Sequence, residues 1–204
     1  MTTEIPLKCE CGAVTGAAKL EPAGRRIVCM CQSCQAFAHF LGRAETMLDA
    51  HGGTDVYQLT PAQVRISQGE DNLHCVRLSD KGILRWYTSC CKTPIGNTLP
   101  SASIPFVGMP TIFVDHTDEQ SLDELLGPVR HRVYARYAIS EPENAHQSGP
   151  ISLIMGTMVN MLVNSVRGLG KPTPFFEPDS GNPVAVPEVL SADDRTALGL
   201  PANP

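Results

Sequence analysis

Seven of the eight cysteines in this 204-residue chain lie in three tight clusters. The clusters are Cys9-Glu10-Cys11-Gly12, Cys29-Met30-Cys31-Gln32-Ser33-Cys34 and Cys90-Cys91. Closely spaced thiolates in a chain that starts without an export signal are typical of zinc binding. We therefore expect bound metal that stabilises the fold and forms the site of any chemical reaction.

The middle cluster has the spacing of an open metal site. Cys29, Cys31 and Cys34 place three thiolates within reach of one ion, and three protein ligands with one open position are the pattern of catalytic zinc. Cys9 and Cys11 need partners from far along the chain, and the Cys90-Cys91 pair is the available supply. These residues predict a closed structural site that joins the N-terminal turn to a later hairpin.

Two other interpretations of the cysteines stay open. An even number of cysteines allows disulfides, although a Cys-x-Cys bridge is strained and a chain of this length does not need such cross-links. The clusters could also be buried thiols without a ligand. Cys75 is different, because it lies in an apolar strand and is expected to be a small buried hydrophobe. His74 beside it makes no Cys-His pair, since adjacent strand residues point to opposite faces.

The composition limits the partners. The formal net charge is -5, and no Lys/Arg block interrupts the chain, so a nucleic-acid backbone is a poor partner. The apolar stretch 151–166 is broken by polar residues and is shorter than the roughly 20 residues of a membrane span. The N-terminus lacks the basic and apolar regions of a secretory signal, so the cytoplasm is the expected compartment.

The pattern of turns predicts a mainly β fold, since Gly and Pro number 17 each and charged residues make up only 18%. Two hairpins are expected, from 56–59 with 64–67 and from 73–78 with 82–87. Further strands are expected at 4–18 around the first cysteine turn, 26–29, 111–114 and 129–139. Short helices are expected at 35–41 and 121–126, and one long helix at about 150–169, with an apolar stripe of period 3.6.

The three cysteine motifs together resemble the glutathione-dependent formaldehyde-activating enzyme family, which includes centromere protein V. The resemblance rests on Cys-x-Cys-Gly, on Cys-x-Cys-x-x-Cys about twenty residues later, and on Cys-x-Thr-Pro after an aromatic strand, and it covers roughly residues 5–115. It implies a zinc-bearing β-tent-like fold. It also implies a structural zinc on Cys9, Cys11 and Cys91, and a labile zinc on Cys29, Cys31 and Cys34 where a glutathione thiolate binds.

The chain departs from that family in the third motif. Thr88 stands where the family's first knuckle cysteine belongs, and Lys92 replaces a glycine. Cys90 could supply the missing sulfur if the backbone bends. Otherwise the site has three protein ligands and water, or no metal. The long C-terminal half is also absent from short family members, which indicates a divergent branch.

A zinc-held thiolate is the nucleophile that a carbonyl needs, so the resemblance implies carbon–sulfur lyase chemistry on an adduct such as S-hydroxymethylglutathione. A weak candidate for the proton donor is His39, although a surface or core histidine is the favoured interpretation. Arg130, Arg132 and Arg136 would share one face of a strand over 129–139 and could bind the carboxylates of glutathione, although a solvated strand face is favoured.

Three functions compete at this point. The first is a zinc-dependent lyase-like enzyme acting on a small-molecule thiol or thiol adduct. The second is a non-catalytic, zinc-stapled protein-binding module, and the third is a redox or metal sensor that uses the middle cluster.

We expect a zinc-binding β-tent-like domain at 1–118, a helix-strand-helix extension at 119–170 packed on it, and a Pro-rich tail at 171–204. The long Met-bearing helix is expected to contribute core packing or a homodimer contact.

Overall fold

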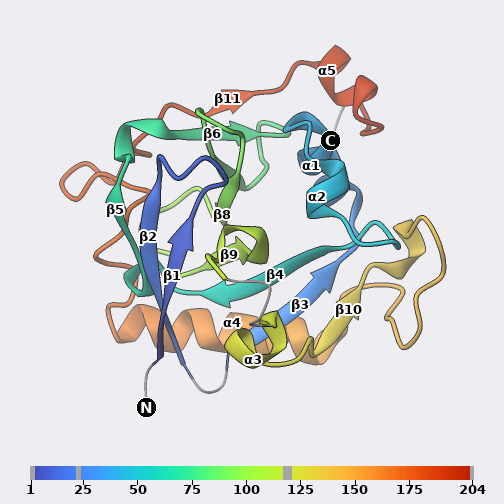
Figure 1. Cartoon of the computed structure of the whole chain (residues 1–204), viewed down its shortest axis with the longest axis horizontal. Helices are drawn as coiled ribbons and strands as arrows, with labels where there is room; N and C mark the ends of the chain where they lie inside the picture. The colour runs from blue at the N-terminus through green and yellow to red at the C-terminus, as the bar shows by residue number, and fades with distance from the viewer. Residues whose placement is uncertain (1–2, 22–23, 117–120, 203–204) are drawn as a thin grey trace.

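The structure, a computed structural model, describes residues 3–21, 24–116 and 121–202. It is mainly β with a long C-terminal helix, as the sequence predicts (Figure 1). The strands are β1 (Thr3–Lys8), β2 (Thr15–Leu20), β3 (Arg25–Cys29), β4 (Thr54–Leu59), β5 (Val64–Gln68), β6 (Leu73–Arg77), β7 (Leu84–Thr88), β8 (Pro94–Thr98), β9 (Val107–Pro110), β10 (His131–Val133) and β11 (Glu188–Val189). The helices are α1 (Gln32–Phe40), α2 (Ala44–Met47), α3 (Leu122–Leu126), α4 (Ile151–Val166) and α5 (Ala192–Ala197), with short 3₁₀ turns at Pro61–Gln63, Glu70–Asn72, Thr111–Phe113 and Ala135–Tyr137.

Within the described residues the strands form two sheets. A small antiparallel sheet has the order β1-β2-β5, and a large mixed sheet has the order β10-β3-β4-β9-β8-β7-β6-β11. The main core includes residues of both sheets, with Trp86, Phe113 and Phe175 fully buried. A second, smaller core packs α1 against β6 and β7 through Phe37 and Tyr87.

The predicted hairpin of β6 and β7 is confirmed, with Cys75 opposite Trp86. The predicted hairpin of 56–59 with 64–67 is wrong, because β4 pairs with β3 and β9 whereas β5 pairs with β2. The 3₁₀ turn Pro61–Gln63 between them carries a capping box with Thr60, which redirects the chain from one sheet to the other. Residues 111–113 likewise form a 3₁₀ turn and not a strand.

The strand predicted over 129–139 ends after three residues. Tyr134 adopts a left-handed conformation with φ 62°, and a 3₁₀ turn follows directly. Left-handed backbone cannot continue a β ladder, so the chain leaves the sheet there. The predicted helices at 121–126 and 150–169 are present as α3 and α4, and Ser121 with Glu124 forms the expected capping box.

The segment 171–204 was expected to be a Pro-rich tail. Instead, Phe175 and Phe176 are inserted into the main core, and Phe175 lies 5.3 Å from Trp86 between ring centroids. Further on, β11 extends the large sheet, and Arg195 is buried against the carbonyls of Leu78 and Pro201. The division at 118 and 170 stays a prediction, but β10 and β11 place both later segments in the large sheet.

Replacing Phe175 by alanine tests the role of this insertion. We expect Phe175→Ala to lower the free energy of unfolding by about 3–5 kcal/mol, because it empties a fully buried ring site. Val186, at 93% exposure, provides the control, and Val186→Ala should change stability by no more than about 0.5 kcal/mol. Urea denaturation of both variants measures the difference, and equal effects would contradict the insertion.

Candidate metal centres

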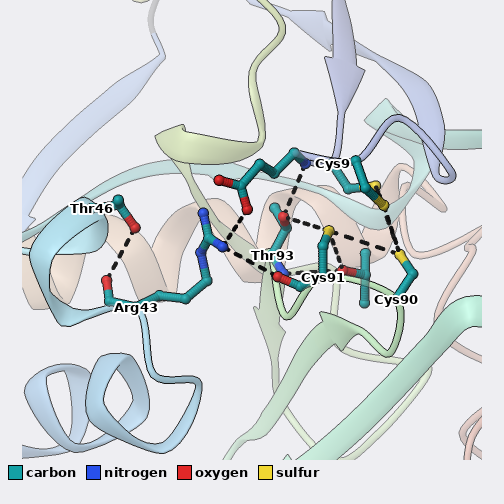
Figure 2. A network of polar contacts seen from close by, with 9 residues as sticks. Cys9, Arg43, Thr46, Cys90, Cys91 and Thr93 are labelled. Carbon is teal, nitrogen blue, oxygen red and sulfur yellow. Dashed lines mark hydrogen bonds and ion pairs between the residues drawn. The ribbon is translucent and has the colours of Figure 1, made fainter.

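The first and third cysteine clusters meet at one point of the fold. The loop after β1 carries Cys9 and Cys11, and the turn after β7 carries Cys90 and Cys91. The four sulfur atoms all lie within 4.8 Å of one another. Figure 2 shows Cys9, Cys90 and Cys91 converging from these two segments. We call this group the four-cysteine cluster.

The sulfur spacings fit one tetrahedral ion. The Sγ atom of Cys90 lies 3.3 Å from that of Cys11, 3.9 Å from that of Cys9 and 3.8 Å from that of Cys91, and Cys9 and Cys11 are 3.6 Å apart. An ion with Zn–S bonds of about 2.3 Å holds its ligands about 3.8 Å apart. The donor set therefore fits a closed metal site and is consistent with zinc, and these four thiols would hold the ion.

Cys90 would fill the ligand position that is left open by Thr88. Two adjacent residues can both face one ion only where the backbone bends, and the bend is provided by Lys92 at φ 58°. The Lys92 N–H donates to the Thr88 carbonyl at 2.9 Å and closes the turn. Lys92 in the position of a glycine is thus accommodated, at the cost of a conformation that side chains rarely adopt.

Thr88 supports the cluster without joining it. Its hydroxyl lies 3.3 Å from the sulfur of Cys91, and the hydroxyl of Thr93 lies 3.2 Å from the same sulfur. Burial would raise the pKa of Cys91, but these two hydrogen bonds, together with hydrogen bonds from the backbone and side chain of Cys11, outweigh it and lower the pKa to about 5. The threonine that replaces the expected cysteine therefore stabilises a neighbouring thiolate.

An arginine that the sequence did not indicate ties the cluster to the helical side of the molecule. Arg43, just before α2, donates to the Cys91 carbonyl at 3.2 Å and pairs with the Glu10 carboxylate (Figure 2). The Glu10 N–H in turn donates to the Thr93 hydroxyl at 3.1 Å. The two cysteine-bearing segments are thereby cross-linked by polar contacts as well as by the sulfurs.

The middle cluster forms a second group at the junction of β3 and α1. Cys29 ends β3, Cys31 precedes the first residue of α1, and Cys34 lies in its first turn. Their sulfur atoms lie within 4.8 Å of one another. Within the described residues, no histidine or carboxylate completes this group, which we call the three-cysteine cluster.

The three thiols share negative charge unequally. Hydrogen bonds from Cys29 and then Cys34 lower the pKa of Cys31 to about 3, while the pKa of Cys29 is raised because its thiol donates to Cys31 and Cys34. The N–H of Cys34 also lowers the pKa of Cys31. Such amides at a helix N-terminus favour thiolates. The group thus suits a cation that accepts several sulfurs.

A buried cation faces this cluster. Arg85 in β7 is 4% exposed, stacks on the Phe37 ring at 5.2 Å and donates to the Asn97 side chain at 3.2 Å. Its charge lowers the pKa of Cys31 and opposes the rise at Cys34. Among the described residues Arg85 has no carboxylate partner. Thiolates at this cluster would therefore provide its counter-charge, a relation that the sequence did not indicate because β7 and α1 are distant in the chain.

The segment after β10 covers the other side of the cluster. The Met30 N–H donates to the Val133 carbonyl at 3.0 Å, and the Gln35 side chain donates to the carbonyls of Met30 and Tyr137 at 2.8 Å each. Burial and then the charges of Cys29 and Cys31 raise the pKa of Tyr134. Its phenol therefore stays protonated beside the cluster and is available as a hydrogen-bond donor.

The other site predictions fare differently. His39 is exposed on α1 and joins neither cluster, so it gains no support as a proton donor. Arg130, Arg132 and Arg136 do not share one strand face, because the strand ends at Val133: Arg132 lies 3.5 Å from Asp49, whereas Arg136 stacks on Tyr137. Cys75 is buried outside both clusters, and burial raises its pKa to about 12.

Comparison with known proteins identifies the family. The sequence profile of a family of unknown function (DUF6151) matches residues 1–188, so the chain belongs to that family. No curated protein matches the chain. A crystal structure of a Rhodobacter sphaeroides protein is similar to 61% of this chain and 97% of its own, at 16% identity and a TM-score of 0.41. The resemblance to formaldehyde-activating enzymes stays a prediction.

A second structural finding concerns membranes. Within the described residues, none of the helices combines the length and apolar character that a transmembrane span requires.

Removing Cys90 tests its place in the four-cysteine cluster. We expect Cys90→Ser to lose about one zinc equivalent per chain and to lower Tm by more than about 5 °C, because a structural ion contributes directly to folding. Elemental analysis and thermal unfolding measure both effects. Cys75→Ala is the matched control and should keep the metal content of the unmodified protein. Unchanged zinc in Cys90→Ser would remove Cys90 from the ligand set.

Proposed function

We propose that this protein is a zinc enzyme in which the four-cysteine cluster holds a structural ion and the three-cysteine cluster holds a reactive one. The observation that carries the proposal is the difference between the two sulfur groups. One offers four thiols and is complete, whereas the other offers three and leaves a position for an exogenous ligand. Structural zinc sites are closed and catalytic sites keep one position open.

The ligand that best fits the open position is a small-molecule thiol. A zinc ion bound there would keep a fourth sulfur deprotonated near neutral pH. In the synthetic direction such a thiolate would add to the carbonyl carbon of an aldehyde: a C–S bond would form as the C=O π bond opens, and the Tyr134 phenol would give its proton to the oxygen. In reverse the hydroxyl proton of the adduct would return to the phenolate, the C=O bond would re-form, and the C–S bond would break to release the aldehyde and the thiolate. This is carbon–sulfur lyase chemistry, and S-hydroxymethylglutathione is an adduct of the required kind.

The chain's own residues supply the supporting functions. The first turn of α1 presents N–H groups to the thiolates, and Arg85 balances their charge from within the core. Tyr134 offers a phenol to an oxygen that develops negative charge. The proposal agrees with the family resemblance of the cysteine motifs, which carries the choice of glutathione and formaldehyde as reactants.

A metal-release experiment separates the two clusters. We expect Cys31→Ser to lose the zinc that a mild chelator removes from the unmodified protein, while Tm changes by less than about 3 °C because the structural ion remains. Cys9→Ser is the matched comparison and should lose the tightly held zinc and unfold at lower temperature. If both variants melt alike, the three-cysteine cluster is structural too, and the zinc-stapled binding module becomes the better description.

Ligand binding tests the chemistry itself. We expect glutathione to protect the labile zinc from the chelator and S-hydroxymethylglutathione to be cleaved or formed at a measurable rate. Tyr134→Phe should lower that rate by about 10²-fold while leaving the zinc content unchanged. Tyr137→Phe, which alters a neighbouring phenol, is the control and should keep the rate. No turnover by the zinc-loaded protein with any thiol–aldehyde pair would reject the enzyme.

Replacing Arg85 tests its role as the counter-charge. Arg85→Met keeps an apolar side chain against Phe37 but removes the positive charge. We expect this variant to lower the affinity of the three-cysteine cluster for zinc by about 10–100-fold. Arg77→Met on the adjacent strand β6 is the matched control and should leave zinc affinity unchanged. A competition titration with a chromogenic chelator measures both affinities. Equal affinities in the two variants would mean that Arg85 serves packing alone.

A further inference from the structure

The apolar stripe of α4 faces away from the protein. Of the sixteen residues of this helix none is buried, and its large apolar side chains point to solvent. The exposed set is Ile151 (79%), Ile154 (45%), Met155 (54%), Met158 (54%), Val159 (54%), Leu162 (67%), Val163 (47%) and Val166 (84%). These positions follow the spacing of an amphipathic helix that buries one face. Of the two roles that the sequence allowed for this helix, core packing within the chain is therefore not the one that the stripe fulfils.

The inner face of α4 is mixed, with Leu153 and Met161 half-buried, and it is anchored at Gly156 and Thr157. The Thr157 hydroxyl accepts from Arg25 at 3.4 Å and lies 3.5 Å from the Gln58 side-chain oxygen. A Cβ atom on Gly156 would lie 3.1 Å from the Arg25 guanidinium, so the helix sits close to β3 at that point. The orientation is therefore held by specific contacts. Rotating the helix to bury its stripe would break them.

We propose that the outer face of α4 is the contact surface for a second copy of this chain. By its side-chain exposures the stripe offers on the order of 500 Å² of apolar surface. A standard stable interface needs about 800 Å² from each partner, so α4 alone supplies more than half of it. A surface of this size is at the upper end of what a monomer leaves uncovered.

The charge distribution favours a symmetric partner. Residues 151–166 include no ionisable side chain, so two copies of the helix meet without like charges facing each other. Met158 lies at the middle of the helix, and a two-fold axis there places Ile151 of one copy near Val166 of the other. In this antiparallel arrangement the positive N-terminal end of each helix dipole lies beside the negative C-terminal end of the other, which is favourable.

A membrane surface fits the same helix less well. Helices that lie in the headgroup region carry Lys and Arg on the polar face to attract anionic lipids, whereas the polar residues of α4 are Ser, Thr and Asn, and the helix carries no Lys or Arg. The net charge of -5 would oppose such binding. The second copy is thus the occupant that the observations favour, independently of what the cysteine clusters do.

Light scattering coupled to size exclusion tests the proposal on the full, zinc-loaded chain. We expect the unmodified protein to have twice the chain mass and Leu162→Glu to have half of that value, with an unchanged circular dichroism spectrum. Val186→Glu is the control, since it places the same charge on an exposed valine near β11, on the side of the molecule opposite α4 (Figure 1). Val186→Glu should keep the doubled mass. A monomeric unmodified protein, or a dimeric Leu162→Glu, would overturn the proposal.

A charge-swap pair tests the two-fold geometry. Met158→Glu and Met158→Lys should each be monomeric, since each copy would meet its own charge, and their equimolar mixture should recover the doubled mass. A mixture that stays monomeric would overturn the two-fold packing. Flotation with vesicles of phosphatidylcholine and phosphatidylserine provides the remaining outcome. An unmodified protein that floats with the vesicles and shows only the monomer mass would overturn the second copy in favour of a lipid surface.

Discussion

Mutual repulsion between thiolates is the constraint on which this structure depends. Sulfur atoms held 3.3–3.9 Å apart cannot all be ionised unless a cation lies among them. In the four-cysteine cluster the sulfurs come from two loops that are about eighty residues apart, so an ion held by them would also close the fold. Hydrogen bonds with Thr88 and Thr93 lower the pKa of Cys91, whereas burial raises the pKa of Cys9 despite the hydrogen bond from the Val14 N–H.

Repulsion between thiolates applies to both clusters, but the residues that surround the two clusters differ. The four-cysteine cluster lies on turns, is partly open to solvent and draws on hydroxyl and backbone donors. The three-cysteine cluster lies where a strand enters a helix, and its surroundings add a buried guanidinium and a phenol. A full positive charge in the core is costly unless it is compensated. Negative charge on the nearby sulfurs would compensate Arg85, and it is also the state that a metal requires.

Much of this arrangement can be predicted from the intervals between residues in the sequence. The cysteine intervals predict both groups, and the turn and strand signals predict a mainly β fold with the β6–β7 hairpin. The sequence allowed Cys90 as a ligand only if the backbone bends, and the bend itself could not be predicted, because no residue preference indicates a left-handed Lys92. Arg85, Arg43 and Tyr134 were missed for another reason, since each reaches its cluster from an element that is adjacent only in the folded chain.

The errors in the fold have a common physical origin. Apolar residues that recur with period 2 or 3.6 indicate which face of a strand or helix is buried, but they do not indicate which surface covers that face. The strands β4 and β5 have the pattern of a hairpin and join different sheets because a capped 3₁₀ turn separates them. The same limit applies to α4, for which the sequence allowed core packing or a homodimer contact, and whose stripe is turned outward by the contacts of Thr157 and Gly156. A stripe that a sequence maintains and a single chain leaves uncovered is explained most directly by an interface between chains.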